Sequence, residues 1–217
     1  VVFARRALKH LQTGALTAKA SDFLFGVDLG FDVVGRRSKF IEGTRDLRRA
    51  RAAAGFTGSR MSPIHGAVIG AALANKGVAM RPYLIAADSL QPQHTREPAE
   101  LQPVVSEQHA AMLVQMLATT ATNGTARRAF KKWPKRLAHV GVAAKTGSLN
   151  GRGSPWRHYS WFVGAAPATR PEIGFAVLSV NGRKGRAKAA DLARAALAIW
   201  FADRAIKPGV IDLATAD

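Results

Sequence analysis

Apolar residues recur every three or four positions in four parts of the chain, a spacing typical of amphipathic helices. Ser62 and Ser106 each stand just before such a segment, where a side-chain oxygen can accept a hydrogen bond from a free backbone N–H. Asn75-Lys76-Gly77 and Asn123-Gly124 stand where a helix is expected to end. The pattern therefore predicts helices over residues 3–13, 62–77, 106–124 and 187–202.

Near the end of the chain the apolar pattern changes from a helical period to a strand period. The runs are Val140–Ser148, Ser160–Ala166 and Ile173–Val180, and short connections that contain Gly and Pro separate them. Short connections of this kind predict an antiparallel meander. Helices followed by a meander and a last helix indicate an α+β fold with helices packed on an antiparallel sheet.

The other segments show no sustained period. Pro82 precedes the apolar run Tyr83–Ala86, which we expect to be a short strand. Gly, Pro and polar residues interrupt the remaining parts, and we expect loops over residues 21–60, 91–103 and 126–139. No internal repeat occurs in the chain, and its 217 residues suit one large domain or two small ones.

Composition narrows the classes of protein to consider. The chain has no cysteine, which excludes disulfide scaffolds, thiol catalysis and cysteine-based zinc sites. His65 and His109 have no second ligand at metal spacing, and we expect neither a metal site nor a cofactor. The formal net charge of +18 favours anionic partners, and no acidic residue occurs between Glu107 and Glu172.

One short motif at the end of the first strand of the meander carries candidate chemistry, Lys145-Thr146-Gly147-Ser148. Other segments accompany it in a definite order: Met61-Ser62-Pro63, then Asn75-Lys76-Gly77, then Asn123-Gly124-Thr125-Ala126, and after the motif Trp161–Pro167 and Ile173–Val180 with Asn181. Together they resemble the transpeptidase domain of penicillin-binding proteins, of the serine acyl-transferase superfamily that includes serine β-lactamases. The resemblance is to class B enzymes, although class A enzymes share these strands.

The resemblance implies a function for the motif. The Lys145–Ser148 strand would form one wall of the acyl-donor cleft, where a D-Ala-D-Ala-type peptidoglycan stem peptide or a β-lactam lies as an added strand. Gly147 would permit close approach, and Lys145, Thr146 and Ser148 would bind the donor carboxylate. The backbone N–H of Ser148 would be an oxyanion-hole donor. His158, near the mouth of the next strand, would lie close to the donor, although a solvated loop histidine is the plainer interpretation.

The family's other two motifs are missing. No serine of the chain has a lysine three residues later, as the nucleophile motif Ser-x-x-Lys requires. Ser148-Leu149-Asn150 and Ser179-Val180-Asn181 match Ser-x-Asn in letters but come too late in the chain. By the resemblance we therefore expect residues 1–217 to be a C-terminal portion of the transpeptidase domain, whose N-terminal part lies upstream. By the same resemblance, the parent would be anchored by an upstream segment on the outer, periplasmic face of the cell membrane and would belong to a cell-wall synthesis complex.

Three alternatives stay open from the sequence. A non-catalytic homologue would keep the fold as a binding or scaffold module. A β-lactamase-type hydrolase would use water as the acyl acceptor. A basic nucleic-acid-binding domain is suggested by Trp133 among the cations of residues 127–136, but no nucleic-acid motif accompanies it, so we expect no nucleic-acid partner. We interpret Gly124 and Thr125 as residues of a turn after a helix.

Overall fold

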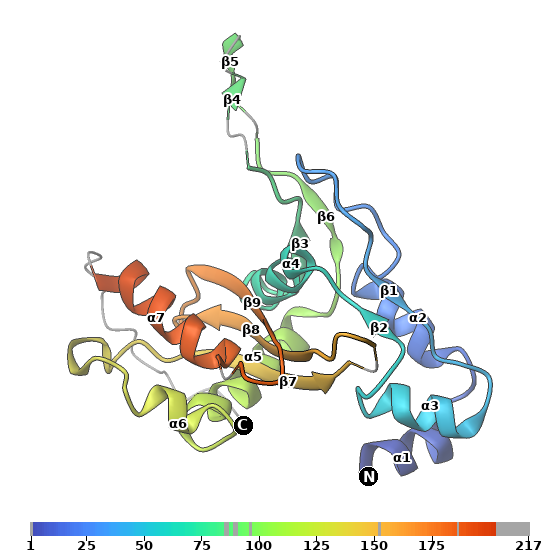
Figure 1. The fold of residues 1–217 in the computed structure, drawn as a ribbon. Helices are drawn as coiled ribbons and strands as arrows, with labels where there is room; N and C mark the ends of the chain where they lie inside the picture. The colour runs from blue at the N-terminus through green and yellow to red at the C-terminus, as the bar shows by residue number, and fades with distance from the viewer. Residues whose placement is uncertain are drawn as a thin grey trace, which may run out of the picture.

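A three-stranded antiparallel sheet lies at the centre of the computed structural model (Figure 1). The structure describes residues 2–84, 87–88, 91–95, 97–151, 153–185 and 187–202. The central strands are β7 (Ala143–Asn150), β8 (His158–Ala166) and β9 (Ile173–Asn181), and they lie in the order β7-β8-β9. The predicted meander is confirmed. Its strands are displaced by up to three residues from the predicted ends.

Helices pack on both faces of this sheet. Successive side chains of a strand point to opposite faces, so Phe162 and Val163 of β8 mark the two sides. Phe162 is buried in one cluster with Leu197 and Phe201 of α7 (Ala189–Ala202). On the other face, α4 (Pro63–Ala74) lies so close that a Cβ added at Gly66 would be 3.4 Å from Cγ2 of Val163. The α+β arrangement of helices on an antiparallel sheet is thus confirmed.

The helix ends follow local sequence signals. Ser62 caps α4, because its hydroxyl accepts a hydrogen bond from the backbone N–H of His65 at 3.2 Å. Ser106 caps α5 (Glu107–Thr122) in the same way, through the backbone N–H of His109 at 3.3 Å. After α4 the chain turns at Gly77, which has a φ of +88° and lies against the carbonyl of Val105. Only glycine fits this position, since a side chain would meet that carbonyl.

The expectation of loops over residues 21–60 holds for 23–38, 41–45 and 54–58 and is wrong for the segments between them. Helix α1 (Val2–His10) precedes this stretch, α2 (Ala15–Asp22) ends just inside it, and α3 (Asp46–Ala53) lies within it. Two short strands, β1 (Lys39–Phe40) and β2 (Ser59–Arg60), pair with each other. The apolar pattern does not reveal α3 because Ala52 is its one buried residue. Polar contacts, described below, hold this helix instead of an apolar stripe.

The strand expected at Tyr83–Ala86 lies earlier, at β3 (Val78–Met80). Tyr83 and Leu84 are in no strand, and residues 85 and 86 are outside the described residues. The loop expected over residues 91–103 is also wrong, because β6 (Glu100–Pro103) pairs with β3, and β5 (Gln91–Thr95) pairs with β4 (Ala87–Asp88). Backbone pairing between distant segments produces these strands, and no alternation in the sequence indicates it.

The basic segment that we expected to be a loop is partly helical. It contains α6 (Arg127–Phe130) and a 3₁₀ helix at Lys135–Leu137. Trp133 donates its indole N–H to the carbonyl oxygen of Leu137 at 2.6 Å, and its ring lies 5.5 Å from that of Phe130. The Phe130 ring lies 5.8 Å from Phe162 of the central sheet. The aromatic side chains therefore fix the segment to the core, which leaves its cations outside.

Candidate functional site

The Lys145–Ser148 motif lies on β7, which is an edge strand of the central sheet. Among the described residues, no strand pairs with its outer edge. Thr146 lies opposite Phe162, and Ser148 lies opposite Ser160. Because side chains alternate along a strand, Thr146 and Ser148 share one face, and Lys145 and Gly147 share the other. The motif thus presents two hydroxyl groups on one side of an open edge.

Lys145 is exposed, and its ammonium group donates a hydrogen bond to the carbonyl oxygen of Thr146 at 2.8 Å. The positive charge of Lys145 is therefore held next to the backbone of Thr146. Gly147 packs closely on β8, since a Cβ added there would be 3.2 Å from Cβ of Trp161. A larger residue at this position would press on β8 and disturb the edge.

Thr146 is held from outside the sheet. Its hydroxyl oxygen lies 2.6 Å from the hydroxyl oxygen of Thr125, which comes 21 residues earlier in the chain. Thr125 stands in the turn between α5 and α6, and α5 packs against β7. The sequence alone indicated only a turn at Thr125, because a contact over this separation leaves no local pattern.

His158 is the first residue of β8, next to the loop that connects β7 and β8, and it lies opposite Asn150. Its Nδ1 is 2.8 Å from Oδ1 of Asn150, and its ring stacks on Trp156 with the centroids 6.3 Å apart. His158 is two positions along β8 from Ser160, the partner of Ser148, which corresponds to about 7 Å. It is five positions from Val163, the partner of Lys145, or about 16 Å. His158 is therefore nearer to Ser148 than to Lys145.

Two further histidines of the six in the chain, His65 and His109, have structural surroundings. His65 is 1% exposed, and its Nε2 lies 2.7 Å from the carbonyl oxygen of Phe23. Burial lowers its pKa, because the charged imidazolium loses its hydration. Nδ1 of His109 lies 3.0 Å from Oγ of Ser106, next to the cap of α5. The part of the chain that the structure describes holds no cluster of three or more metal-ligating side chains.

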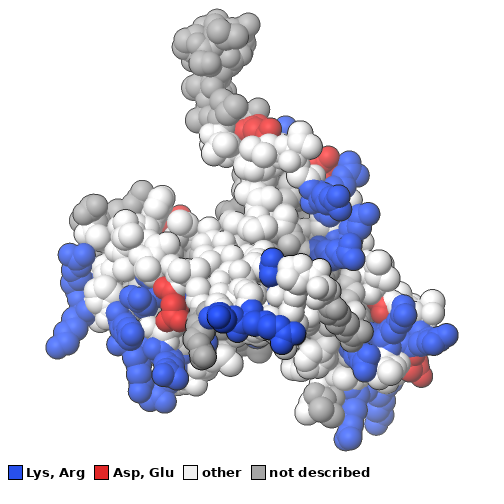
Figure 2. Space-filling model, viewed as in Figure 1, with Lys and Arg blue, Asp and Glu red and all other residues white. Residues whose placement is uncertain are grey.

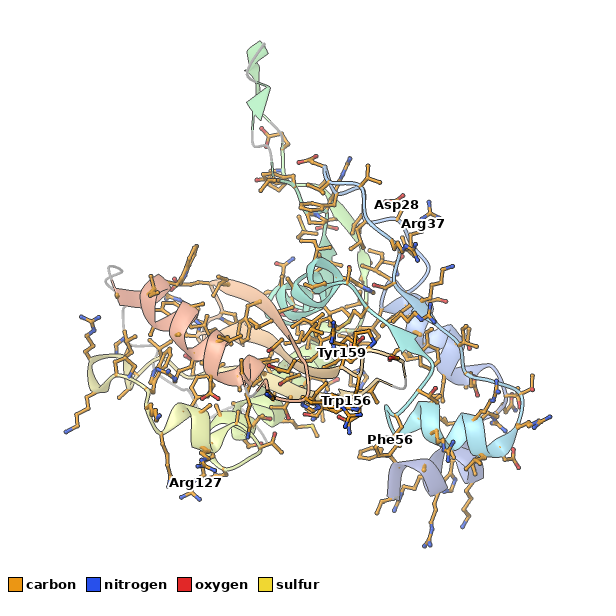
Figure 3. All side chains as sticks on the ribbon, in the orientation of Figure 1. Asp28, Arg37, Phe56, Arg127, Trp156 and Tyr159 are labelled. Carbon is orange, nitrogen blue, oxygen red and sulfur yellow. The ribbon has the colours of Figure 1, made fainter. Side chains whose placement is uncertain are left out.

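The basic segment forms an exposed row of cations. Arg127 lies at its start (Figure 3), and blue side chains project at several places along the rim of the molecule (Figure 2). The exposed cations of the segment are Arg127, Arg128, Lys131, Lys132, Lys135 and Arg136. Like charges so close together repel one another.

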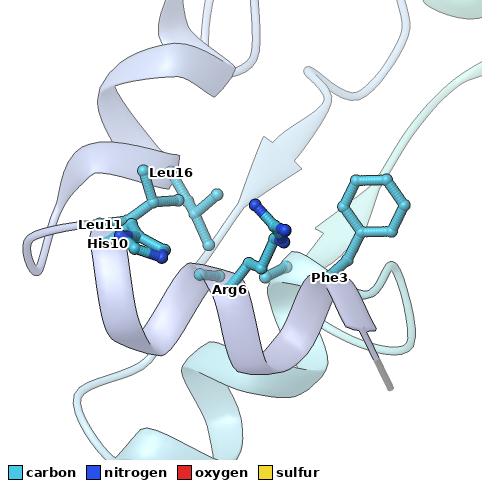
Figure 4. A pocket seen from close by; sticks show the side chains of 7 residues that line it. Phe3, Arg6, His10, Leu11 and Leu16 are labelled. Atoms are coloured by element: carbon cyan, nitrogen blue, oxygen red, sulfur yellow. The ribbon is translucent and has the colours of Figure 1, made fainter.

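A hollow of about 460 Å³ lies by α1 (Figure 4), and no residue of the motif lines it. Its lining is mostly apolar, with Arg6 and His10 as the polar members, and the other lining residues are Phe3, Ala7, Leu11, Leu16 and Ala53. Neither polar group is paired with a carboxylate or hydroxyl in a catalytic arrangement among the described residues. The hollow therefore offers less chemistry than the β7 edge. No helix within the described ranges is long and apolar enough to span a membrane.

The β7 edge is suited to one kind of ligand. An edge strand can pair with an extended peptide through backbone hydrogen bonds. Two hydroxyl groups and an ammonium group beside that edge are donors for a carboxylate. The arrangement can therefore bind a peptide or a peptide-like molecule that ends in a carboxylate, although it contains no activated nucleophile of its own.

Comparisons with known proteins agree with this arrangement. The family described as "Penicillin binding protein transpeptidase domain" matches residues 1–198. The chain is 30% identical over 148 residues to the peptidoglycan D,D-transpeptidase PbpA of Mycolicibacterium smegmatis, a match that covers 64% of the chain and 29% of that protein. The chain thus spans less than a third of this relative.

Solved structures share the fold. Penicillin-binding protein A from M. tuberculosis, determined as an imipenem acyl-enzyme complex, superposes with a TM-score of 0.75 at 26% identity, covering 90% of the chain and 43% of that protein. The D,D-transpeptidase domain of a peptidoglycan glycosyltransferase from Eggerthella lenta superposes with a TM-score of 0.71 at 25% identity, covering 93% of the chain and 50% of that one. In both cases about half of the known structure has no counterpart in the chain.

Proposed function

This chain belongs to the penicillin-binding protein transpeptidase domain family, and from that premise we propose that it forms the substrate-binding wall of a peptidoglycan D,D-transpeptidase. The observation that carries the proposal is the open edge of β7, with the exposed Lys145 and two hydroxyl groups beside it. The substrate is a stem peptide that ends in D-Ala-D-Ala, and β-lactams occupy the same edge as its mimics.

Each residue of the motif has a role in the proposal. Thr146 and Ser148 donate hydrogen bonds to the terminal carboxylate, and Lys145 adds a positive charge. The backbone N–H of Ser148 is one donor of the oxyanion hole, which stabilises the tetrahedral intermediate. Gly147 keeps the edge free of a side chain so that the substrate backbone can approach. His158 contacts the part of the substrate that extends past Ser148.

The serine that forms the ester lies outside these 217 residues, since no Ser-x-x-Lys motif occurs in them. Acyl transfer then proceeds from the donor peptide to that serine, with loss of the terminal D-Ala, and from the serine to an amine of a neighbouring stem peptide. The parent protein acts on the outer face of the cell membrane, held there by an upstream anchor, within a cell-wall synthesis complex.

The test is labelling of the full-length gene product with a penicillin, followed by intact-mass measurement and mapping of the labelled peptide. We expect one adduct, on a serine upstream of Val1 in a Ser-x-x-Lys context. Lys145→Ala should slow acylation by about 10²-fold, because it removes a charge-assisted hydrogen bond. Lys184→Ala, at an exposed turn between β9 and α7, is the matched control and should label at the wild-type rate.

The other outcomes separate the alternatives. A folded full-length protein that forms no adduct would be a non-catalytic homologue and would refute the proposal. An adduct that is released within seconds, with stoichiometric excess of hydrolysed penicillin, would identify a β-lactamase-type hydrolase. Equal labelling of Lys145→Ala and Lys184→Ala would refute the role of the β7 edge.

A further inference from the structure

The Thr125 hydroxyl group reaches the motif strand from a different part of the fold. Its oxygen lies 2.6 Å from Oγ1 of Thr146, a short separation for two hydroxyl groups. The two residues are separated by 21 positions in the sequence, and Thr146 is half-buried. This contact connects the turn after α5 to the Thr146 hydroxyl group of the Lys145–Ser148 motif.

The turn does not need the Thr125 side chain to keep its shape. Its backbone is closed by hydrogen bonds from the N–H of Ala126 to the carbonyl of Thr120, at 3.1 Å, and from the N–H of Arg127 to the carbonyl of Gly124, at 3.1 Å. Ala126 is 1% exposed and anchors the turn in the core. The Thr125 hydroxyl group is therefore available for a task beyond local structure.

A threonine hydroxyl has one hydrogen to donate and two lone pairs that accept. If Thr146 donated its hydrogen to Thr125, it would have none for a carboxylate. If Thr125 donates to Thr146, the Thr146 hydrogen is directed to the open edge, and each hydrogen bond in such a chain strengthens the next. Only the second arrangement leaves the Thr146 hydrogen free to be donated to an anionic ligand.

We propose that Thr125 is a positioning residue, which orients the Thr146 hydroxyl group towards the carboxylate of the donor peptide or β-lactam. The inference rests on the proposed function of the β7 edge and assigns a role to a residue outside the motif. Thr125 acts through Thr146 and does not itself contact the ligand. Its contribution therefore depends on the ligand carboxylate.

The test compares three variants of the full-length gene product in penicillin acylation. Thr125→Val removes the hydroxyl group at nearly constant shape, and Thr125→Ser keeps it. Thr122→Val is the matched control, because within the described ranges the Thr122 hydroxyl bonds to carbonyls of its own helix alone, at 3.3 Å for Thr119 and 3.5 Å for Ala118. We expect Thr125→Val to lose about three- to tenfold in the second-order acylation rate, and the other two variants to stay within twofold of the wild type.

A second ligand separates positioning from a structural role. With the methyl ester of the same penicillin, which lacks the carboxylate, wild type and Thr125→Val should acylate at the same rate. An equal loss with acid and ester would show a general distortion and overturn the proposal. Equal rates for Thr125→Val and Thr122→Val, or a loss in Thr125→Ser as large as in Thr125→Val, would also overturn it. Absence of labelling in the wild type would instead refute the proposed function, and the inference with it.

Discussion

The Glu42 carboxylate should be the largest single polar contribution to the stability of the N-terminal part. Its side chain is 5% exposed and accepts hydrogen bonds from the backbone N–H of Gly14 at 3.0 Å and of Thr17 at 3.4 Å. The guanidinium group of Arg49 donates to it at 3.2 Å and also to the carbonyl of Leu11 at 2.9 Å. One buried ion pair therefore joins α3 to the connection between α1 and α2.

Glu42→Ala would leave a largely buried guanidinium group and two backbone N–H groups without their acceptor. Breaking a buried pair by removal of one partner costs about 3–5 kcal/mol. In this variant Arg49 would still donate hydrogen bonds to the carbonyl oxygen of Leu11 and to Asp46, the latter at 3.5 Å. We therefore expect a loss of stability at the lower end of this range, about 3 kcal/mol. Glu42→Gln keeps an acceptor oxygen but loses the charge, and its cost should be smaller.

Amide hydrogen exchange of the full-length gene product measures this loss of local stability, because the amides of Gly14 and Thr17 exchange when this region opens. A loss of about 3 kcal/mol corresponds to exchange about 10²-fold faster. Asp28→Ala is the control, since the Asp28–Arg37 pair is exposed at 67% and 58% (Figure 3) and should change exchange little. Exchange in Glu42→Ala within twofold of the wild type, or equal to that in Asp28→Ala, would refute the reasoning.

Two further predictions concern the core. Burial lowers the pKa of His65 below 6.5, so the folded state favours the neutral ring, and stability should be complete above about pH 6.5 and fall as pH decreases below it. The urea midpoint of the wild type should therefore decrease between about pH 7.5 and 5.5, and a decrease as large in His65→Gln would contradict this assignment. Gly70→Ala should lower stability by about 1–3 kcal/mol, because its Cβ would overlap the carbonyl of Gly164 in β8. Gly35→Ala, whose Cβ would have its nearest neighbour at 3.9 Å, is the control in thermal unfolding, and an equal melting temperature for the two variants would contradict the close packing of α4 on the sheet.

Sequence signals that act within a few residues were sufficient to predict much of the fold. The serines at positions 62 and 106 cap their helices as predicted, because a cap depends on the next three residues alone. The three apolar runs after Val140 and the short connections between them predicted the meander, since both signals lie within a few residues. The Lys145–Ser148 motif and its order among the other segments were visible without any coordinates, and so was the family resemblance.

Contacts between distant segments could not be predicted from the sequence and became visible only in the tertiary structure. Helix α3 has no apolar stripe and depends on the Glu42–Arg49 pair, whose members reveal nothing in isolation. The strands β3 and β6 form by backbone pairing across more than twenty residues, which side-chain patterns do not encode. The Thr125–Thr146 contact is of the same kind: each residue is an ordinary threonine in the sequence, and only the packing of α5 against β7 brings their hydroxyl groups together. A local pattern reports which surface of an element is buried, whereas the partner that meets it is decided by the three-dimensional packing of the whole chain.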